Sequence, residues 1–143
     1  MKFENYMVLE FPSRSSNEGF ARSAVAAFVA QMDPTIEELG DIRTAVSEAV
    51  TNCIVHAYPQ TYGLISLRCR ILKGNILDIV IKDKGIGIRD IEEAKRPMFT
   101  TGGSDRTGMG FTIMESFMSY LSVTSKENRG TTVHMRRKLH KKQ

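Results

Sequence analysis

The 143-residue sequence contains no tryptophan, only two cysteines and four prolines, and no long apolar run. Because a membrane-spanning helix needs roughly 20 apolar residues, we expect no membrane segment. In the stretch Met1–Phe11, polar and apolar residues alternate from near the start, and no small-residue cleavage site follows. Both features argue against a signal peptide. Cys53 and Cys69 lie in apolar surroundings, so we expect buried free thiols in a reducing, cytoplasmic compartment rather than a disulfide or a metal site.

The basic charge of the chain is concentrated at its carboxyl end. The formal net charge is +4, yet residues 1–135 carry 15 basic and 16 acidic groups. The remaining basic residues are Arg136, Arg137, Lys138, Lys141 and Lys142. We therefore expect one domain over residues 1–143 with a solvated basic tail from about residue 136, and no direct binding of nucleic acid.

Apolar periodicity predicts the order strand, helix, helix, hairpin, small helix, loop, helix, hairpin. The expected elements are a strand at Tyr6–Phe11, helices at Asn17–Gln31 and Pro34–His56, strands at Leu64–Leu72 and Asn75–Asp83, a small helix at Asp90–Ala94, a loop at Lys95–Thr107, a helix after Gly110, and strands at Leu121–Ser125 and Thr131–Arg137. Antiparallel hairpins with grouped helices favour an α+β two-layer sandwich, with a mixed, mostly antiparallel sheet and the helices on one face.

Each long helix shows an apolar stripe. In the first, the expected stripe is Phe20, Ala24, Ala27 and Phe28, and Ser15 and Glu18 have the spacing of a capping box. This stripe turns Arg22 toward solvent. In the second helix, the expected stripe is Ile36, Leu39, Ile42, Val46, Val50 and Cys53.

Glu48 and Asn52 lie four residues apart, on one face of the second helix, beside its apolar stripe. A carboxylate and a carboxamide at the border of a core can line a pocket. Glutamate accepts protons, and the asparagine carbonyl is a neutral ligand for a hard cation. An ordinary polar flank gives the same pattern, so the pair alone leaves both interpretations open.

Asp83-x-Gly85-x-Gly87 follows an apolar strand. The glycines allow a sharp turn or a close approach of a ligand. A carboxylate at this point can accept a hydrogen bond from an exocyclic amine such as that of adenine. The alternative is a plain turn between a strand and a helix.

Gly108-Met109-Gly110 precedes a helix. Free N–H groups at a helix amino terminus form an anion site, and Arg106 could reach a terminal phosphate. A flexible connector is the alternative. Nothing matches a P-loop, and neither glycine cluster lies in the strand–helix–strand unit that a Rossmann fingerprint requires.

In combination, these motifs resemble the three ATP-binding boxes of the gyrase, histidine-kinase and mismatch-repair ATPase superfamily, which has the Bergerat fold. The stretches SEAVTNCIVHAY, PMFTT, RTGMGFTIMESFM and RGTTV are similar to the bacterial anti-sigma factor serine kinases, most of all to the sporulation, sigma-F type. The resemblance covers nearly the whole chain. It implies a homodimeric protein that inhibits a sigma factor and uses ATP and Mg²⁺ to phosphorylate a serine of its anti-anti-sigma antagonist.

The resemblance also implies roles for individual residues. Glu48 matches the general base, Asn52 the Mg²⁺ ligand, and Asp83 the residue that reads adenine, with Gly85 and Gly87 making room for the base.

Further positions match the nucleotide lid and a partner surface. Thr131 matches a strand residue that supports adenine, and Arg22 matches a surface residue that contacts protein partners. The matching lid and phosphate contacts are Thr101, Arg106, Gly108, Met109 and Gly110. The lid segment Gly102–Asp105 is shorter and richer in glycine than the family pattern.

The sequence leaves three competing functions open. The catalytic domain of a sensor histidine kinase needs an acceptor histidine on a preceding helix, whereas His56, His134 and His140 lie within or after the ATP-binding motifs. The second competing function is that of an anti-sigma kinase of the general-stress pathway. The third is a nucleotide-binding module without phosphotransfer.

Overall fold

The computed structural model describes residues 3–87 and 110–140. In chain order the elements are β1 (Phe3–Pro12), α1 (Ser16–Val29), the 3₁₀ helix η1 (Ala30–Met32), α2 (Ile36–Asn52), the π-helix η2 (Cys53–Ala57), β2 (Leu64–Leu72), β3 (Ile76–Asp83), α4 (Gly110–Phe117), β4 (Tyr120–Lys126) and β5 (Gly130–Lys138). The expected small helix at Asp90–Ala94 and loop at Lys95–Thr107 lie outside the described residues.

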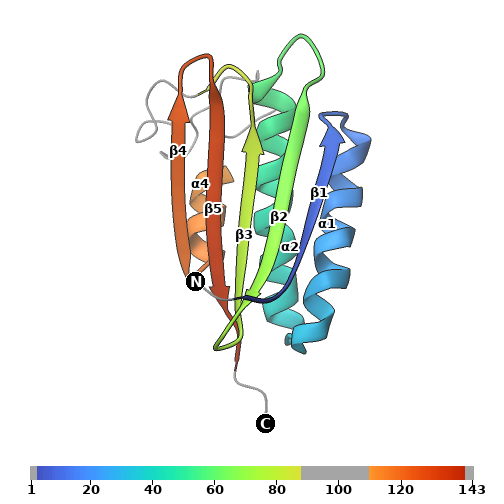
Figure 1. The fold of residues 1–143 in the computed structure, drawn as a ribbon, viewed down its shortest axis with the longest axis vertical. Coiled ribbons are helices and arrows are strands. Elements are labelled where there is room, and N and C mark those ends of the chain that lie inside the picture. Colours follow the sequence, from blue (N-terminus) through green and yellow to red (C-terminus); the bar gives the residue numbers. More distant parts are fainter. Residues whose placement is uncertain (1–2, 88–109, 141–143) are drawn as a thin grey trace.

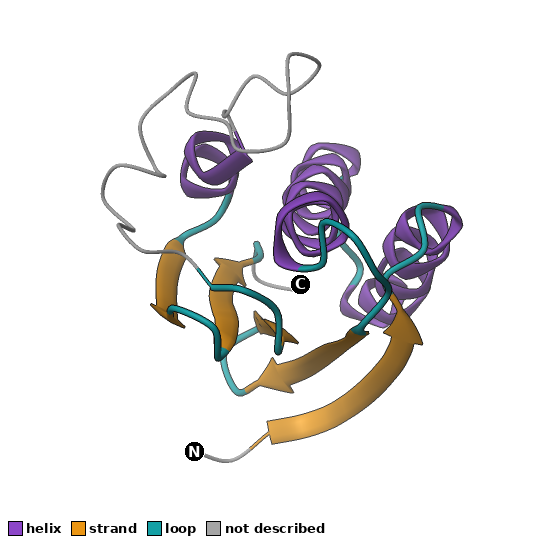
Figure 2. Cartoon of the chain, turned by 90° about the horizontal axis from the view of Figure 1, so that it is seen from above, coloured by secondary structure: helices purple, strands orange, loops and turns teal. Residues whose placement is uncertain are grey.

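The five strands form one sheet in the order β1-β2-β3-β5-β4, and the helices lie on one of its faces (Figures 1 and 2). Every pair of neighbouring strands is antiparallel. The predicted two-layer α/β sandwich is therefore confirmed, although no parallel pair occurs among the described strands. Gly74 and Asn75, with φ of 93° and 60°, form the turn between β2 and β3.

The core lies between the sheet and the helices α1, α2 and α4. Alternate residues of β3, Leu77, Ile79 and Ile81, are fully buried toward the helices, because successive side chains of a strand point to opposite faces. In α2, Ile42 and Val46 are also fully buried, as expected. Ile36 was expected in this stripe but is 94% exposed at the start of the helix.

The predicted stripe of α1 is wrong. Phe20 is 53% exposed, whereas Ala21, Val25 and Val29 are fully buried. Because apolar residues occupy almost the whole circumference of this helix, periodicity does not fix which side faces the core. The actual rotation leaves the side chain of Arg22 only 39% exposed, so it is half-buried rather than turned fully to solvent.

The capping box also forms at a different helix from the one expected. Ser15 makes no side-chain cap. At the start of α2, however, Glu38 N donates to Thr35 Oγ1 (3.0 Å) and Thr35 N donates to Glu38 Oε1 (2.9 Å). The Glu18 carboxylate instead points toward α2, where it accepts a hydrogen bond from the hydroxyl of Ser47.

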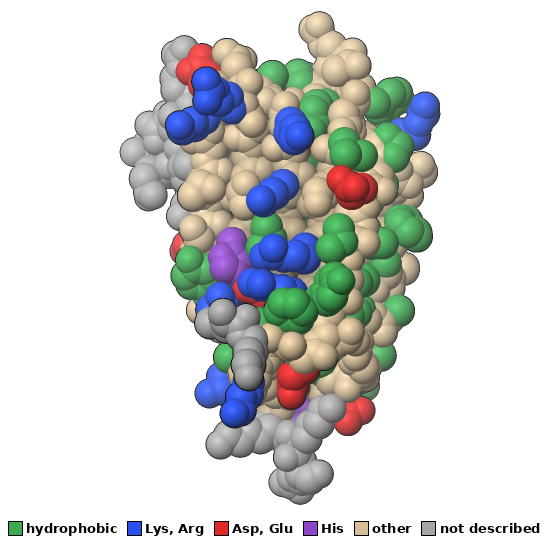
Figure 3. Space-filling model, in the orientation of Figure 1, with side chains coloured by type: hydrophobic (Ala, Val, Ile, Leu, Met, Phe, Trp, Pro, Cys, Tyr) green, Lys and Arg blue, Asp and Glu red, His purple; other side chains and the backbone are tan. Residues whose placement is uncertain are grey.

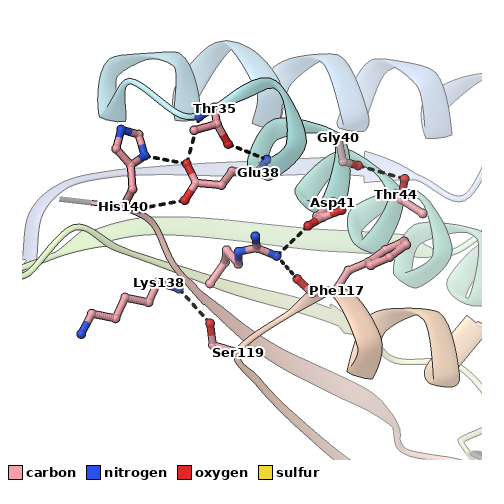
Figure 4. A network of polar contacts seen from close by, with 10 residues as sticks. Thr35, Glu38, Gly40, Asp41, Thr44, Phe117, Ser119, Lys138 and His140 are labelled. Carbon is pink, nitrogen blue, oxygen red and sulfur yellow. Dashed lines mark hydrogen bonds and ion pairs between the residues drawn. The ribbon is translucent and has the colours of Figure 1, made fainter. Parts of the chain in front are cut away.

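The last described residues, up to His140, are held against α2, which corrects the first part of the expected tail (Figure 4). Lys141 and Lys142 of that tail lie outside the described residues. Arg136–Lys138 belong to β5. Arg137 pairs with Asp41 at 2.9 Å, and the backbone N and ring Nδ1 of His140 lie 2.7 and 2.8 Å from the Glu38 carboxylate. Burial would raise the pKa of Glu38, but hydrogen bonds from Thr35 and His140 outweigh it and lower this pKa to about 2.

The outer face of the sheet carries a charge cluster around Asp78, where Figure 3 shows Lys, Arg and His side chains gathered. The Asp78 side chain is fully buried and pairs with Arg70 (3.1 Å), Arg136 (2.8 Å) and the ring of His134. Burial opposes ionisation, yet these partners keep the pKa of Asp78 below its usual value. This cluster accounts for one of the basic residues that the sequence placed in a solvated tail.

Candidate functional site

Glu48 and Asn52 converge on the first residue of α4. A methyl group placed on Gly110 would lie 3.2 Å from Glu48 Oε2 and 3.4 Å from Asn52 Oδ1. Both side chains project from the last turns of α2 and are half-buried. The structure thus brings three of the predicted site residues together at a helix amino terminus.

The end of α2 changes from an α-helix to the π-helix η2 after Asn52. The predicted helical stretch to His56 is thus confirmed, with a wider last turn than an α-helix. Short π-helical turns occur often at functional sites. Here the turn carries Cys53 toward Asp83 and leaves the carbonyl of Ala57 to accept a hydrogen bond from Ile86 N at 3.0 Å.

Asp83 lies at the end of β3, paired in register with Thr131 of β5. Its Oδ1 accepts hydrogen bonds from Gly85 N (2.9 Å) and Thr131 N (3.2 Å), and its Oδ2 accepts one from the Cys53 thiol (3.4 Å). Burial raises the pKa of Asp83, and these three bonds oppose that effect. Burial, with Asp83 alongside, also raises the pKa of Cys53, so the thiol keeps its proton and donates it.

The glycines after Asp83 pass between the π-helix and the turn that joins β4 to β5. A methyl group on Gly85 would lie 2.1 Å from the carbonyl oxygen of Ala57. Gly87 has a φ of 77°, and a methyl group there would lie 2.1 Å from the carbonyl oxygen of Lys126. Only glycine fits both positions, because one has no space for a side chain and the other also needs a left-handed backbone.

Two groups near this site were not predicted as functional. The sequence indicated Cys53 only as a buried thiol, and Tyr58 was not singled out. The hydroxyl of Tyr58 accepts from Lys84 N (2.7 Å) and donates to the carbonyl of Leu64 (2.9 Å), which ties the π-helix to both β2 and the glycine segment. Both residues lie in the stretch SEAVTNCIVHAY, but only the three-dimensional structure shows their contacts with the Asp83 segment.

The predicted residues therefore fall into two adjoining groups. Glu48, Asn52 and Gly110 meet at the start of α4. The second group is Asp83, Gly85, Gly87 and Thr131, and the π-helix that begins directly after Asn52 reaches it. Thr101, Arg106, Gly108 and Met109 lie outside the described residues.

A pocket of about 310 Å³ lies beside the first group, between α1 and α2. It is lined by Arg22, Gly40, Arg43, Thr44, Ser47 and Glu48. Glu48 thus lies near the start of α4 and also lines this pocket. The pocket also brings Arg22, which was predicted to contact partners, close to the predicted general base.

The described residues contain no group of three or more His, Cys, Asp or Glu side chains that could hold a metal ion. The donor set at Asn52 still fits Mg²⁺, which keeps several waters and is held by one or two protein oxygens together with substrate phosphates. The carboxamide oxygen of Asn52, beside the carboxylate of Glu48, is a donor of this kind. No described helix is long and apolar enough to cross a membrane.

Residues 11–137 match the family model of the histidine kinase-like ATPase domain. The fold agrees: the histidine kinase domain of a blue-light activated protein from Erythrobacter litoralis aligns with a TM-score of 0.59 at 22% identity, covering 85% of this chain and 61% of that one. The RsbU and RsbW domains of a Mycobacterium tuberculosis protein align with a TM-score of 0.70 at 16% identity, covering 94% of this chain and 32% of that one. The chain is thus an ATP-binding domain of the histidine kinase-like class.

Relatives with curated names show to which family within this class the chain belongs. Over 136 residues the chain is 54% identical to the anti-sigma F factor of Caldanaerobacter subterraneus subsp. tengcongensis, with 94% of each chain covered. It is 50% identical over 139 residues to the anti-sigma F factor of Geobacillus kaustophilus, covering 96% of this chain and 94% of the relative. The chain belongs to the anti-sigma F factor family, which confirms the family predicted from its motifs.

Proposed function

We propose that this chain is a cytoplasmic anti-sigma factor that binds and inhibits a sporulation sigma factor of the sigma-F type. It also acts as a serine kinase, which uses ATP and Mg²⁺ to phosphorylate and inactivate its anti-anti-sigma antagonist. The observation that carries the kinase proposal is the position of Glu48. Its carboxylate, like the Asn52 side chain, lies against Gly110 at the start of α4, and it also lines a pocket that is open between two helices.

Asp83 selects adenine in this proposal. Two backbone N–H groups hold Oδ1, whereas Oδ2 accepts only a weak thiol bond from the described residues. Oδ2 therefore keeps a lone pair for the exocyclic amine of adenine. Guanine would present a carbonyl oxygen to the same acceptor, and the resulting repulsion favours ATP over GTP.

Asn52 and the start of α4 hold the phosphates. The N–H groups at a helix amino terminus attract negative charge, and Gly110 brings that terminus against Asn52 without a side chain between them. Asn52 Oδ1 would hold the Mg²⁺ ion, which neutralises phosphate charge when bound. The predicted lid residues, Arg106 among them, would add donors from the segment after Gly87.

Glu48 takes the proton from the acceptor serine. Phosphoryl transfer needs mainly positioning and charge stabilisation, together with a group that accepts the hydroxyl proton as the oxygen attacks the terminal phosphorus. Glu48 borders both the phosphate side and the pocket, so it can meet a hydroxyl that enters from a second protein. Two copies of the chain would form the proposed homodimer.

The test is to incubate the purified chain with terminally labelled ATP, Mg²⁺ and the antagonist protein. We expect label on a serine of the antagonist. Label on a histidine of this chain would instead indicate a sensor-kinase chemistry. ATP binding without any transfer would leave a nucleotide-binding module and overturn the kinase proposal. Titration with sporulation and general-stress sigma factors then separates the two branches of the family.

A further inference from the structure

The pocket between α1 and α2 contains two arginines with unused hydrogen-bond donors. The side chain of Arg43 is exposed and makes no hydrogen bond or ion pair with any other described residue. The Nε of Arg22 is buried and has no partner in the described part of the chain, and its Nη1 lies 3.7 Å from Glu18. Because a guanidinium group donates and never accepts, this pair favours an anionic ligand.

The neighbouring groups of the pocket are already engaged within the protein. The hydroxyl of Thr44 donates to the carbonyl of Gly40 at 2.9 Å (Figure 4), and that of Ser47 donates to Glu18. Glu18 is therefore held between Ser47 and Arg22, and its charge offsets part of that of Arg22. Arg43 makes no ion pair with a described residue, although Glu48 lines the same pocket, so Arg43 is the more available anchor for an incoming anion.

The position of Arg43 relative to Glu48 sets the distance between an anion and an acceptor hydroxyl. The two residues are five positions apart on α2, which is about 7.5 Å along the helix axis. An extended peptide covers that distance in about two residues. The reach of the arginine side chain widens this range to roughly two to four residues.

We propose that this pocket docks an acidic side chain of the acceptor protein, located about two to four residues from the serine that is phosphorylated, and that Arg43 determines this specificity. The inference rests on the proposed kinase function. A carboxylate fits better than a phosphate group, because Glu48 forms one wall and would repel a dianion more strongly than a single negative charge. Arg43 then selects the acceptor, while Glu48 acts on its hydroxyl.

The test compares Arg43→Ala with the wild-type chain in the transfer assay at saturating ATP. Loss of one charge-assisted hydrogen bond predicts a rise of about 10- to 100-fold in KM for the antagonist, with kcat and the KM for ATP unchanged. Lys73→Ala, at the far end of β3 from Asp83, is the matched control that removes an exposed cation without affecting the pocket. An unchanged KM in Arg43→Ala would overturn the inference.

Charge reversal gives a second readout. Arg43→Glu should bind the antagonist much more weakly than the wild type does. An antagonist whose acidic residue near the serine is changed to lysine should bind this variant again, but should not bind the wild-type chain. If the wild-type chain shows no transfer, the kinase proposal fails. Binding titrations of the antagonist with the same Arg43 variants then test the docking proposal separately from the kinase proposal. Equal affinities for the wild type and the variants would overturn the docking proposal, and restored binding of the charge-reversed pair would support it.

Discussion

A single methyl group on Gly85 should weaken both nucleotide binding and folding. In Gly85→Ala the new Cβ would lie 2.1 Å from the carbonyl oxygen of Ala57, whereas ordinary contacts begin at 3.4 Å. The glycine segment and the π-helix must therefore move apart by about 1.3 Å, the difference between these distances. That shift breaks the Ile86–Ala57 hydrogen bond of 3.0 Å and moves Gly85 N, which holds Asp83 at 2.9 Å.

The variant should lose both ATP affinity and folding stability, by free energies of similar size. A displaced Asp83 forfeits a hydrogen bond between a charged group and adenine, which is about 1.5–3 kcal/mol, or about 10- to 150-fold in Kd for ATP. Forcing a methyl group into a packed site costs about 1–3 kcal/mol of folding stability. For a chain of this size that corresponds to a melting temperature lower by roughly 3–10 °C.

Calorimetric titration with ATP and a thermal melt without nucleotide measure the two effects separately. Gly19→Ala is the matched control, because a methyl group there has as its nearest neighbour Arg22 Nη2 at 3.8 Å, an ordinary contact. This variant should bind ATP like the wild type and melt no lower, since alanine is the better helix former. Wild-type ATP affinity in Gly85→Ala would refute the assignment of the Asp83 segment to adenine.

Three further variants test other parts of the account. Asn52→Ala should abolish the dependence of ATP affinity on Mg²⁺, measured by titration with and without a chelator, and a retained dependence would exclude Asn52 as the ligand. Arg22→Ala should leave the melting temperature nearly unchanged, because a partly exposed ion pair contributes about 0–1 kcal/mol, yet weaken both the sigma factor and antagonist complexes. Unchanged affinities for both the sigma factor and the antagonist would show that Arg22 is an ordinary surface residue and does not contact these partners. Glu38→Gln should destabilise the chain at neutral pH by about 0.5–2 kcal/mol, because the neutral amide loses the charge that strengthens the hydrogen bonds from Thr35 and His140. Since the pKa of Glu38 falls from 4.5 to about 2 on folding, its contribution is complete above pH 4.5 and is lost as the pH falls toward 2. Urea midpoints of the two proteins should therefore converge in acid, and a constant gap would contradict this.

The sequence predicted the elements and the site residues best where local chemistry is distinctive. The Asp83-x-Gly85-x-Gly87 motif identified a glycine segment after a strand, and the contacts of Gly85 and Gly87 show why glycine is needed there. The spacing of Glu48 and Asn52 placed both on one face of α2, and the structure turns that face toward Gly110.

The rest could not be predicted because it depends on contacts between distant segments. The rotation of α1 is set by which apolar side packs on the sheet, so Val25 is buried and Phe20 is not. Ser15 and Thr35 both precede a glutamate at capping-box spacing, but only Thr35 forms the box, because Glu18 contacts Ser47 instead.

The carboxyl end illustrates the same limit. Arg137 reads as part of a basic tail in the sequence, yet it pairs with Asp41, which lies 96 positions earlier in the chain. The hydrogen bond from the Cys53 thiol to Asp83 likewise depends on the π-helical turn after Asn52, which local helix propensity does not predict.

The most direct measurement of the central claim is the rate of phosphate transfer by Glu48→Gln compared with its affinity for ATP. Glutamine keeps the size of the side chain but cannot take a proton. If Glu48 is the general base, the rate of serine phosphorylation on the antagonist should fall by about 10²–10⁴, with the Kd for ATP within a few-fold of wild type. A variant that phosphorylates the antagonist at the wild-type rate would contradict the account.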